Sequence, residues 1–360
     1  MGLLVVAPAP GVPVLGPSGA SAHLRGIVWA AHRAGLGPRL VAAAASDRRG
    51  VHGAVPVPIE AASPTGWPSW LRPYRERREA IVAWKLARLA LRGPATALTY
   101  ERWSLFADVG ARVREATGAP WVLEVNAPLL LERQRYEEVI DPAYAARAQA
   151  RALRGADRLV AVSAWVARWL VEEVGVEPAR VRRVPNGVEA ATVDREALRA
   201  ELGLEGRFVV GFLGSMKPWH GAERLAAVLD ALPDALGLAV GGDPPARLAA
   251  HPRARCVGQV DEARAAQLVA AMDVGLAPYP ADAPPWFCPL KVAAYRAQGT
   301  PVVATDVGEL RELVGSGGEV VEDSDAALAA ACRRWEGRRA APLVRTWDAV
   351  LAESIEGLPR

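Results

Sequence analysis

The feature that most constrains the fold is the alternation of short apolar, β-branched runs with longer helical patterns. Leu3 to Val6 predicts a strand, and Ser21 to Ala34 places its apolar residues on one helical face. Arg39 to Ala43 predicts the next strand after the glycines that end this helix. Strands that alternate with helices of about 10–15 residues are typical of βαβ units and parallel sheets. The chain is therefore expected to be an α/β protein.

This alternation starts twice along the 360 residues. The stretch from Glu189 to Gly206 between the two series is polar and helical, and a new strand follows at 208–212. We expect two doubly wound domains, with residues 1–188 in the first and residues 189–340 in the second. In the first series we expect strands at 3–6, 39–43, 96–99, 121–125, 159–162 and 181–184. In the second we expect them at 208–212, 238–240, 255–257, 274–277 and 302–304.

Composition excludes several classes of protein. The 43 Lys and Arg nearly balance the 40 Asp and Glu, which does not favour a dedicated nucleic-acid binder. Cys256, Cys288 and Cys332 are too far apart for a zinc ribbon or a redox dithiol and fit a reducing cytoplasm. The first residues lack the basic segment of a signal peptide, and no apolar run is long enough to cross a membrane. We expect a cytoplasmic protein.

Ligands of doubly wound domains bind beyond the carboxyl ends of the strands, so the loops there are the first candidates. The loop after the first strand carries Gly16 and Gly19, and a helix begins near Ser21. Glycine backbone and the N–H groups of a helix N-terminus can bind phosphate. The alternative is a plain loop with Ser21 as the N-cap. His23 follows in the helix, either near a ligand or satisfied within the structure.

The segment Gly214 to Gly221 combines a cation, an aromatic ring and an imidazole directly after a strand. Lys217 and His220 would stabilise the charge that grows on a departing diphosphate, together with helix N–H groups. The alternative is a surface lysine beside a packed Trp219.

The segment from Phe287 to Ala304 places Lys291 in the first turn of a helix, after Pro289 and Leu290. This is an unfavourable position for a cation, so an anion nearby would explain it. The alternative is a side chain that turns away into water. Asn186 and Gly187 follow another strand, where Asn-Gly predicts a tight turn with positive φ.

Two further polar residues follow strands of the first domain. Arg102 comes after the strand predicted at 96–99, and Asn126 after the strand at 121–125. Each could also be an ordinary interface residue. Zincin, Walker A and nucleophile-elbow motifs are absent from the sequence. The Asp323-Ser324-Asp325 segment is better explained by helix capping than by a metal.

Together these segments resemble the retaining GT-B glycosyltransferases of the family 4 type, the group that includes glycogen synthase and sucrose synthase. The resemblance covers nearly the whole chain. The segments that carry it are the glycine loop at Gly16, Tyr100-Glu101-Arg102, Leu123 to Pro128, Ala156-Asp157-Arg158, Val162-Ser163, Val184 to Val188, Gly214 to Gly221 and Phe287 to Ala304.

The resemblance implies two Rossmann-like domains that face each other across a cleft, with the nucleotide sugar held by the C-terminal domain and most of the acceptor by the N-terminal domain. Residues 341–360 would form a helix that crosses back to the N-terminal domain. It also implies retention of anomeric configuration without a bound metal or other cofactor. The expected partners are a nucleotide-diphosphate sugar and a small-molecule or cell-envelope acceptor.

The implied site divides into three groups of residues. The catalytic residues would be Lys217, His220 and Lys291. The donor-binding residues would be Gly16, Gly19, Asn186, Gly214, Ser215, Pro289 and Leu290, and the acceptor-binding residues His23, Arg102 and Asn126.

The chain departs from the family pattern at several positions. Two acidic residues eight apart are replaced by Trp286 and Ala294, and the family's Arg and Lys that bind the diphosphate are replaced by Ser215 and His220. Lys217 and Lys291 are the candidates to replace the two cations. The alternatives are therefore a catalytically degenerate partner of an active transferase, or another GT-B-like activity such as epimerisation or coupling to a nitrogen or phosphate acceptor.

The segment from Arg72 to Arg92 is rich in basic and aromatic residues, as interfacial helices are. Its apolar and basic positions interleave on a helical projection, however, as for Leu89 between Lys85 and Val82. The sequence therefore favours a solvated basic helix that lines the acceptor cleft over one that binds a membrane.

Overall fold

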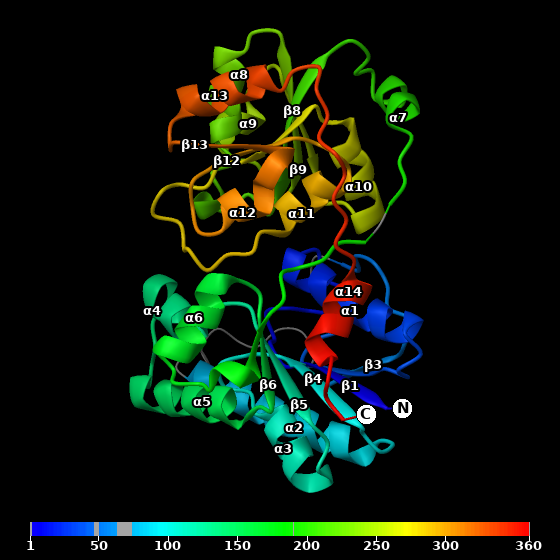
Figure 1. Ribbon diagram of the computed structural model, residues 1–360, viewed down its shortest axis with the longest axis vertical. Coiled ribbons are helices and arrows are strands. Elements are labelled where there is room, and N and C mark those ends of the chain that lie inside the picture. The colour runs from blue at the N-terminus through cyan, green and yellow to red at the C-terminus, as the bar shows by residue number, and fades with distance from the viewer. Residues whose placement is uncertain (1, 47–49, 63–73, 190, 360) are drawn as a thin grey trace. The chain divides into compact units, whose positions relative to one another are not determined.

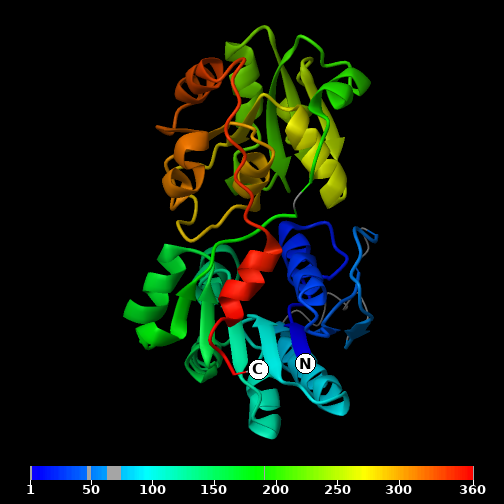
Figure 2. The same cartoon turned by 45° about the vertical axis from the view of Figure 1, so that its right-hand side comes forward.

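The computed structural model describes residues 2–46, 50–62, 74–189 and 191–359, which divide into two compact units (Figures 1 and 2). The first unit comprises Met1–Pro185, Trp286–Cys288 and Trp347–Arg360, and the second comprises Asn186–Pro285 and Pro289–Thr346. The sequence placed the boundary after residue 188, a few residues beyond Pro185.

The described residues of the first unit build a seven-stranded parallel sheet in the order β3-β2-β1-β4-β5-β6-β7. The inner strands are buried on both faces, as expected for a parallel sheet that is covered by helices. The strands are β1 (Leu3–Ala7), β2 (Arg39–Ala42), β3 (Ile59–Ala61), β4 (Leu98–Arg102), β5 (Trp121–Val125), β6 (Arg158–Ala161) and β7 (Val181–Arg183).

The helices of this unit begin at recognisable caps. Ser18, Asp141 and Ser163 each accept a hydrogen bond from a backbone N–H in the first turn of the helix that follows. The helices are α1 (Gly19–Arg33), α2 (Arg75–Arg92), α3 (Val109–Thr117), α4 (Leu129–Tyr136), α5 (Pro142–Gly155), α6 (Ala164–Glu172), the short η2 (Pro178–Arg180) and α14 (Trp347–Ile355).

The second unit builds a six-stranded parallel sheet in the order β10-β9-β8-β11-β12-β13. Its strands are β8 (Phe208–Gly214), β9 (Ala235–Gly241), β10 (Ala254–Gly258), β11 (Val274–Ala277), β12 (Val302–Thr305) and β13 (Gly318–Val321). Its helices are α7 (Arg195–Glu201), η3 (Pro218–His220), α8 (Arg224–Ala231), α9 (Ala246–Ala249), α10 (Glu262–Ala271), α11 (Leu290–Ala297), α12 (Leu310–Val314), η4 (Gly315–Gly317) and α13 (Asp325–Arg334).

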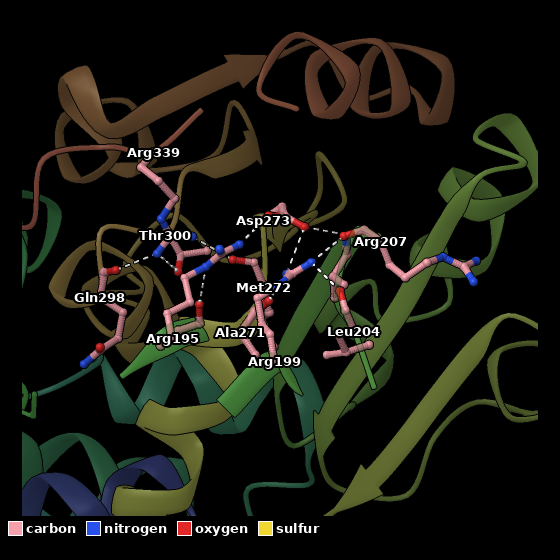
Figure 3. Close-up of polar contacts among 12 residues, drawn as sticks. Arg195, Arg199, Leu204, Arg207, Ala271, Met272, Asp273, Gln298, Thr300 and Arg339 are labelled. Carbon is pink, nitrogen blue, oxygen red and sulfur yellow. Dashed lines mark hydrogen bonds and ion pairs between the residues drawn. The ribbon is translucent and has the colours of Figure 1, made fainter. Parts of the chain in front are cut away.

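A polar layer around Asp273 secures α7 to this second unit (Figure 3). The Asp273 carboxylate accepts hydrogen bonds from the Val209 N–H, at 2.8 Å, and from the guanidinium groups of Arg195 and Arg199. Arg339 donates to the carbonyl oxygens of Met272 and Gln298, both at 2.7 Å. The polar stretch that the sequence marked as a boundary is therefore docked on the second unit.

Several local predictions were wrong by a few residues, and three of them concern candidate site residues. The strand predicted at 96–99 runs from Leu98 to Arg102, so Arg102 ends the strand rather than following it. Ser18, not Ser21, caps α1, because the Ser18 Oγ accepts from the Ser21 N–H while Ser21 is buried. Gly214 is the last residue of β8, and α8 begins only at Arg224, after the turn of η3.

Two segments from the C-terminal half of the chain belong to the first unit. The buried Trp286 packs against Trp165 with 5.2 Å between ring centroids, and the Ser163 hydroxyl donates to the Trp286 carbonyl. Helix α14 packs on α1, where the indole of Trp347 lies over Gly26. None of the described helices is both long and apolar enough to span a bilayer.

We expect Gly26→Ala to destabilise the protein, although alanine favours helix more than glycine does. A Cβ at residue 26 would lie 2.3 Å from the Trp347 ring, which is buried. Such overpacking costs about 1–3 kcal/mol of unfolding free energy, measured by chemical denaturation. In a Trp347→Ala background the same substitution should be neutral or stabilising. Equal losses in both backgrounds would contradict the packing explanation.

Candidate functional site

Each sheet has a point at which its strand order reverses, between β1 and β4 in the first unit and between β8 and β11 in the second. Loops leave the sheet in opposite directions on either side of such a point and open a crevice at the carboxyl ends of the strands. Predicted residues gather at both positions. Gly16 follows β1 and Arg102 ends β4, while Gly214 ends β8.

In the second unit, glycines allow the ends of β8 and β9 to approach closely. A Cβ at Gly241 would lie 1.8 Å from the Gly214 carbonyl oxygen, and one at Gly242 would lie 2.4 Å from that of Ser215. The Gly242 N–H donates to the Gly214 carbonyl oxygen at 3.0 Å. Gly214 and Gly241 also have φ of 153° and 131°, which side chains rarely adopt. This contact directs the chain into the predicted loop.

The loop after β8 turns sharply before α8 begins. Met216 has a φ of 53°, the only positive value for a non-glycine among the described residues. Such strain is often kept at functional sites. Gly221 ends η3 with a φ of 67°, and a Cβ there would lie 2.0 Å from the Pro278 carbonyl oxygen. The Ser215 Oγ and the His220 Nδ1 are 3.3 Å apart within this turn.

Lys291 lies in the first turn of α11, as predicted, and its side chain does not turn into water. The residue is only 6% exposed, and its Nζ has no hydrogen-bond partner among the described residues. The Nζ lies 3.9 Å from the centre of the Phe212 ring and 4.9 Å from that of Tyr279. A Cβ at Gly214 would lie 3.3 Å from it. The ammonium group therefore points to the end of β8.

Burial lowers the pKa of Lys291 to about 7, far below that of a free lysine. Burial, together with the charges of Lys291 and Lys217, lowers the pKa of His220 to about 3. His220 is therefore neutral near pH 7 and offers hydrogen bonds rather than charge. An anion bound here would reverse these shifts, because it would stabilise both cationic forms.

Tyr295, one turn after Lys291, fastens α11 to the sheet. Its hydroxyl accepts from the Leu213 N–H at 2.7 Å and donates to the Leu276 carbonyl oxygen at 3.2 Å. Gly275 leaves room for the ring, because a Cβ there would lie 2.6 Å from it. Tyr295 thus joins β8 and β11 beneath the helix that carries Lys291.

The other predicted residues of this unit are placed more loosely. Lys217 is exposed, with its Nζ 5.0 Å from the centre of the Trp219 ring. Pro289 is the N-cap residue of α11 and Leu290 its first residue, both half-buried. The tight turn predicted at Asn186 was wrong, because Gly187 has no positive φ. Glycine is required at position 187 because the backbone of residue 345 passes close by: a Cβ on Gly187 would lie 3.0 Å from the Arg345 carbonyl oxygen.

In the first unit, the buried carboxylate of Glu124 joins the three predicted acceptor residues. His23 Nε2 lies 2.8 Å from Glu124 Oε2, and the Tyr100 hydroxyl donates to the same oxygen at 2.6 Å. Arg102 donates to Oε1 at 2.8 Å, and the Asn126 amide donates to Oε1 as well. The sequence predicted His23, Arg102 and Asn126 separately, and the structure brings them together.

Charge explains how Glu124 tolerates burial. Burial alone would raise the pKa of Glu124, but the charges of His23 and Arg102 and the hydrogen bonds from His23 and Tyr100 hold it well below its usual value. Burial and the Glu124 charge raise the pKa of Tyr100, so this phenol stays protonated and donates. The His23 ring also lies 4.5 Å from that of Trp347. The result is an ionised carboxylate inside a fixed set of donors.

The glycine loop after β1 is held from below by Arg25. This buried side chain donates to the carbonyl oxygens of Val14 and Gly16, at 2.7 and 2.8 Å. A Cβ at Gly16 would lie 2.8 Å from the Ser21 Oγ, so close packing selects this glycine. Gly19 is the exposed first residue of α1. Its backbone is part of the positive end of that helix.

Comparison with known proteins identifies the family of the chain. Residues 17–192 match the family model "Glycosyltransferase Family 4", and residues 207–336 match "Glycosyl transferases group 1". The sucrose-phosphate synthase from Thermosynechococcus elongatus has the same fold, with a TM-score of 0.70 at 20% identity, covering 100% of this chain and 95% of that one. HepE from Anabaena, solved in complex with UDP and glucose, gives a TM-score of 0.69 at 20% identity, covering 98% and 95%.

Together the two models match most of the chain. The chain belongs to the GT-B glycosyltransferases of the family 4 type. Two curated relatives are named D-inositol 3-phosphate glycosyltransferase. The one from Geodermatophilus obscurus is 36% identical over 51% of this chain and 46% of its own length, and the one from Thermomonospora curvata is 29% identical over 72% and 70%. The chain thus spans about half the length of the first relative.

Sequence reasoning about this family 4 chain missed Glu124, Tyr100, Tyr279 and Tyr295. A signal existed for the first two. Arg102 and Glu124 are register partners on adjacent parallel strands, and Tyr100 lies two residues before Arg102. Side chains two apart share a face of a sheet, so Tyr100, Arg102, Glu124 and Asn126 could have been placed together. No comparable periodicity marks Tyr279 or Tyr295.

We expect Lys291→Met to stabilise the unliganded protein at pH 7 by roughly 1–3 kcal/mol, because it removes a buried ammonium that has no hydrogen-bond partner among the described residues. Between about pH 7 and 10 the unfolded amine binds more protons than the folded one, so wild-type stability rises with pH. The variant should lose this rise. Urea unfolding at several pH values measures both effects. Lys217→Met, at an exposed lysine, is the control and should change stability by less than about 0.5 kcal/mol.

We expect Glu124→Gln to destabilise the protein by about 3–5 kcal/mol, because it leaves Arg102 and His23 beside a neutral group in a buried site. The exposed Glu115 on α3 offers a matched Glu115→Gln control with little expected effect. Thermal unfolding of both variants measures the difference. Equal stability of the two would mean that the Glu124 ion pairs contribute nothing to the fold.

Proposed function

We propose that this protein is a retaining glycosyltransferase that moves a sugar from a nucleotide-diphosphate sugar to a small-molecule or cell-envelope acceptor. The observation that carries the proposal is the buried Lys291 ammonium at the end of β8, for which the described part of the chain supplies no hydrogen-bond partner. A cation in the first turn of a helix, with a depressed pKa, is costly unless an anion visits the site. The diphosphate of the donor is that anion.

Each residue of the second unit then has a distinct part in binding the donor. Lys291 would stabilise the charge that develops on the leaving diphosphate, and it would act strongly because it is shielded from water. Neutral His220 and Ser215 would donate hydrogen bonds, and Lys217 would add a second, exposed cation. The N–H groups at the start of α11, after Pro289 and Leu290, would face the phosphates. This set supplies positive charge from the protein itself, and we propose that it works without a metal.

The acceptor would be held in the first unit by the groups around Glu124. The guanidinium of Arg102 has five N–H donors and uses one nitrogen on Glu124, so other donors remain to bind an acceptor. His23 and Asn126 are fixed in orientation by the same carboxylate. Hydroxyl-rich or phosphorylated acceptors suit such donors. D-inositol 3-phosphate, which the names of the curated relatives contain, is the first acceptor to test.

We place this reaction in the cytoplasm, and the cysteines support that proposal. Cys256 and Cys332 are free thiols, as is usual in a reducing compartment.

One observation favours the alternative of a catalytically degenerate partner protein. Ala294 lies one turn after Lys291 on α11, half-buried, where family members have an acidic residue that binds the nucleotide ribose. Loss of those hydrogen bonds would weaken donor binding by about 1.5–3 kcal/mol. This is a factor of about ten to 150 in affinity.

Thermal shifts with UDP, GDP, dTDP, ADP and CDP and their common sugars distinguish the two proposals. One nucleotide at a hundred times its dissociation constant should stabilise the fold by about 2.7 kcal/mol. Lys291→Met should abolish the shift, and Ala294→Glu should enlarge it by restoring the ribose contact.

The matched control is Lys85→Met, on α2 in the first unit, which should leave the shift unchanged. A nucleotide shift without hydrolysis or transfer of any sugar would support the degenerate alternative. Absence of every shift in the folded wild type and in Ala294→Glu would contradict donor binding altogether.

A further inference from the structure

Helix α2 exposes a continuous stripe of large apolar and basic side chains. Tyr74, just before the helix, is 59% exposed, and Ile81, Trp84 and Leu91 are 48%, 45% and 44% exposed. The positions 77, 81, 84, 88 and 91 follow the three- and four-residue spacing that places side chains on one helical face. We call the exposed residues of this helix the outer face of α2. They are Tyr74, Arg77, Ile81, Trp84, Lys85, Arg88, Leu91 and Arg92.

The outer face carries four basic residues and no carboxylate. The two acidic residues of α2, Glu76 and Glu79, lie outside this face and are bonded to other groups. Glu76 is buried and accepts from the N–H groups of Ile140 and Asp141, and Glu79 pairs with Arg133 at 2.9 Å. The outer face therefore has a positive charge that its own helix does not neutralise.

The residues of α2 divide into a buried face and an exposed face more clearly than the sequence suggested. Val82, Ala83, Leu86, Ala87 and Ala90 form the inner face and are buried. Leu89, which the helical projection placed among basic residues, is half-buried and packs against the core of the unit. The exposed apolar residues Ile81, Trp84 and Leu91 therefore lie together on the outer face. Trp67, Trp70 and Arg72, which the sequence associated with this helix, lie outside the described residues.

We propose that the outer face of α2 binds the surface of an anionic lipid bilayer. Tyr and Trp prefer the interface between lipid and water, where the ring is buried among headgroups and the polar atom stays wet. Arg and Lys can bury their stems beside apolar groups while their charges reach lipid phosphates. The guanidinium of Arg88 already lies 4.7 Å from the centre of the Trp84 ring. This pairing fits a shallow, charge-assisted contact.

The combination of groups favours lipid over other anionic partners. Ile81 and Leu91 offer nothing to a phosphate backbone in water, but they gain free energy when they enter the headgroup region. Long-range attraction comes from Arg77, Lys85, Arg88 and Arg92, since each basic residue near an anionic membrane strengthens binding about fivefold. The proposal concerns a surface of the first unit alone and does not depend on the proposed transferase function.

Co-sedimentation with vesicles tests the proposal on the full chain. We expect binding to phosphatidylglycerol–phosphatidylcholine vesicles in about 0.1 M salt, and release in about 1 M salt, where screening is much stronger. Vesicles of phosphatidylcholine alone should bind little protein. Equal binding to both kinds of vesicle, or to neither, would overturn the proposal.

Two double variants separate the contributions of charge and of apolar contact. Arg77→Gln with Arg88→Gln should weaken vesicle binding about 25-fold, the product of two fivefold losses. Ile81→Ser with Trp84→Ser should weaken binding at low salt as well, by removing the groups that enter the bilayer. The matched controls are Arg247→Gln and Val257→Ser, at exposed residues of the second unit, which should bind as the wild type does.

The result that overturns the proposal is wild-type binding by both double variants, each shown by its melting curve to be folded. Retention of a single-stranded oligonucleotide in preference to anionic vesicles would also overturn it and would assign the outer face to nucleic acid instead.

Discussion

The second unit depends on the burial of one lysine, Lys291, whose Nζ has no hydrogen-bond partner among the described residues. The Lys291 Nζ lies 3.9 Å from the centre of the Phe212 ring and 4.9 Å from that of Tyr279, and Lys291 is in the first turn of α11. A buried amine stays in such a place only when the surrounding structure fixes its position. Tyr295 fixes α11, which carries Lys291, because its hydroxyl bonds to both β8 and β11. The glycines at the ends of β8 and β9 direct the next loop toward the same point. Burial of this amine lowers the stability of the unliganded protein.

In the first unit, by contrast, a buried charged group has partners within the protein. The Glu124 carboxylate is surrounded by donors from α1, β4 and the end of β5, so its charge is compensated without a ligand. A compensated centre holds its neighbours in fixed orientations, whereas an uncompensated one attracts a counter-ion. The two units of this family 4 chain thus differ: the buried Glu124 has charged partners, whereas the buried Lys291 Nζ has no hydrogen-bond partner among the described residues.

The sequence predicted the parallel α/β architecture because apolar periodicity in strands and the residues that end helices are local signals. The strands at 121–125 and 274–277 were predicted to the residue, and Lys291 lies in the helical turn expected of it. Predictions were poorer where distant segments decide. Gly187 is explained by the backbone at Arg345, more than a hundred residues away, and not by a local turn. Glu124 was missed because its role depends on hydrogen-bond partners on α1 and β4, which the sequence of its own strand does not show.

The division of the chain into units has a consequence for any attempt to separate them. The first unit is discontinuous, since it takes Trp286–Cys288 and Trp347–Arg360 from beyond the second. Expression of residues 1–185 alone would leave its core without the Trp286 indole and would uncover the face of α1 where Trp347 packs. The two halves are therefore not interchangeable modules. Exchange of the first unit between relatives would have to carry all three segments together.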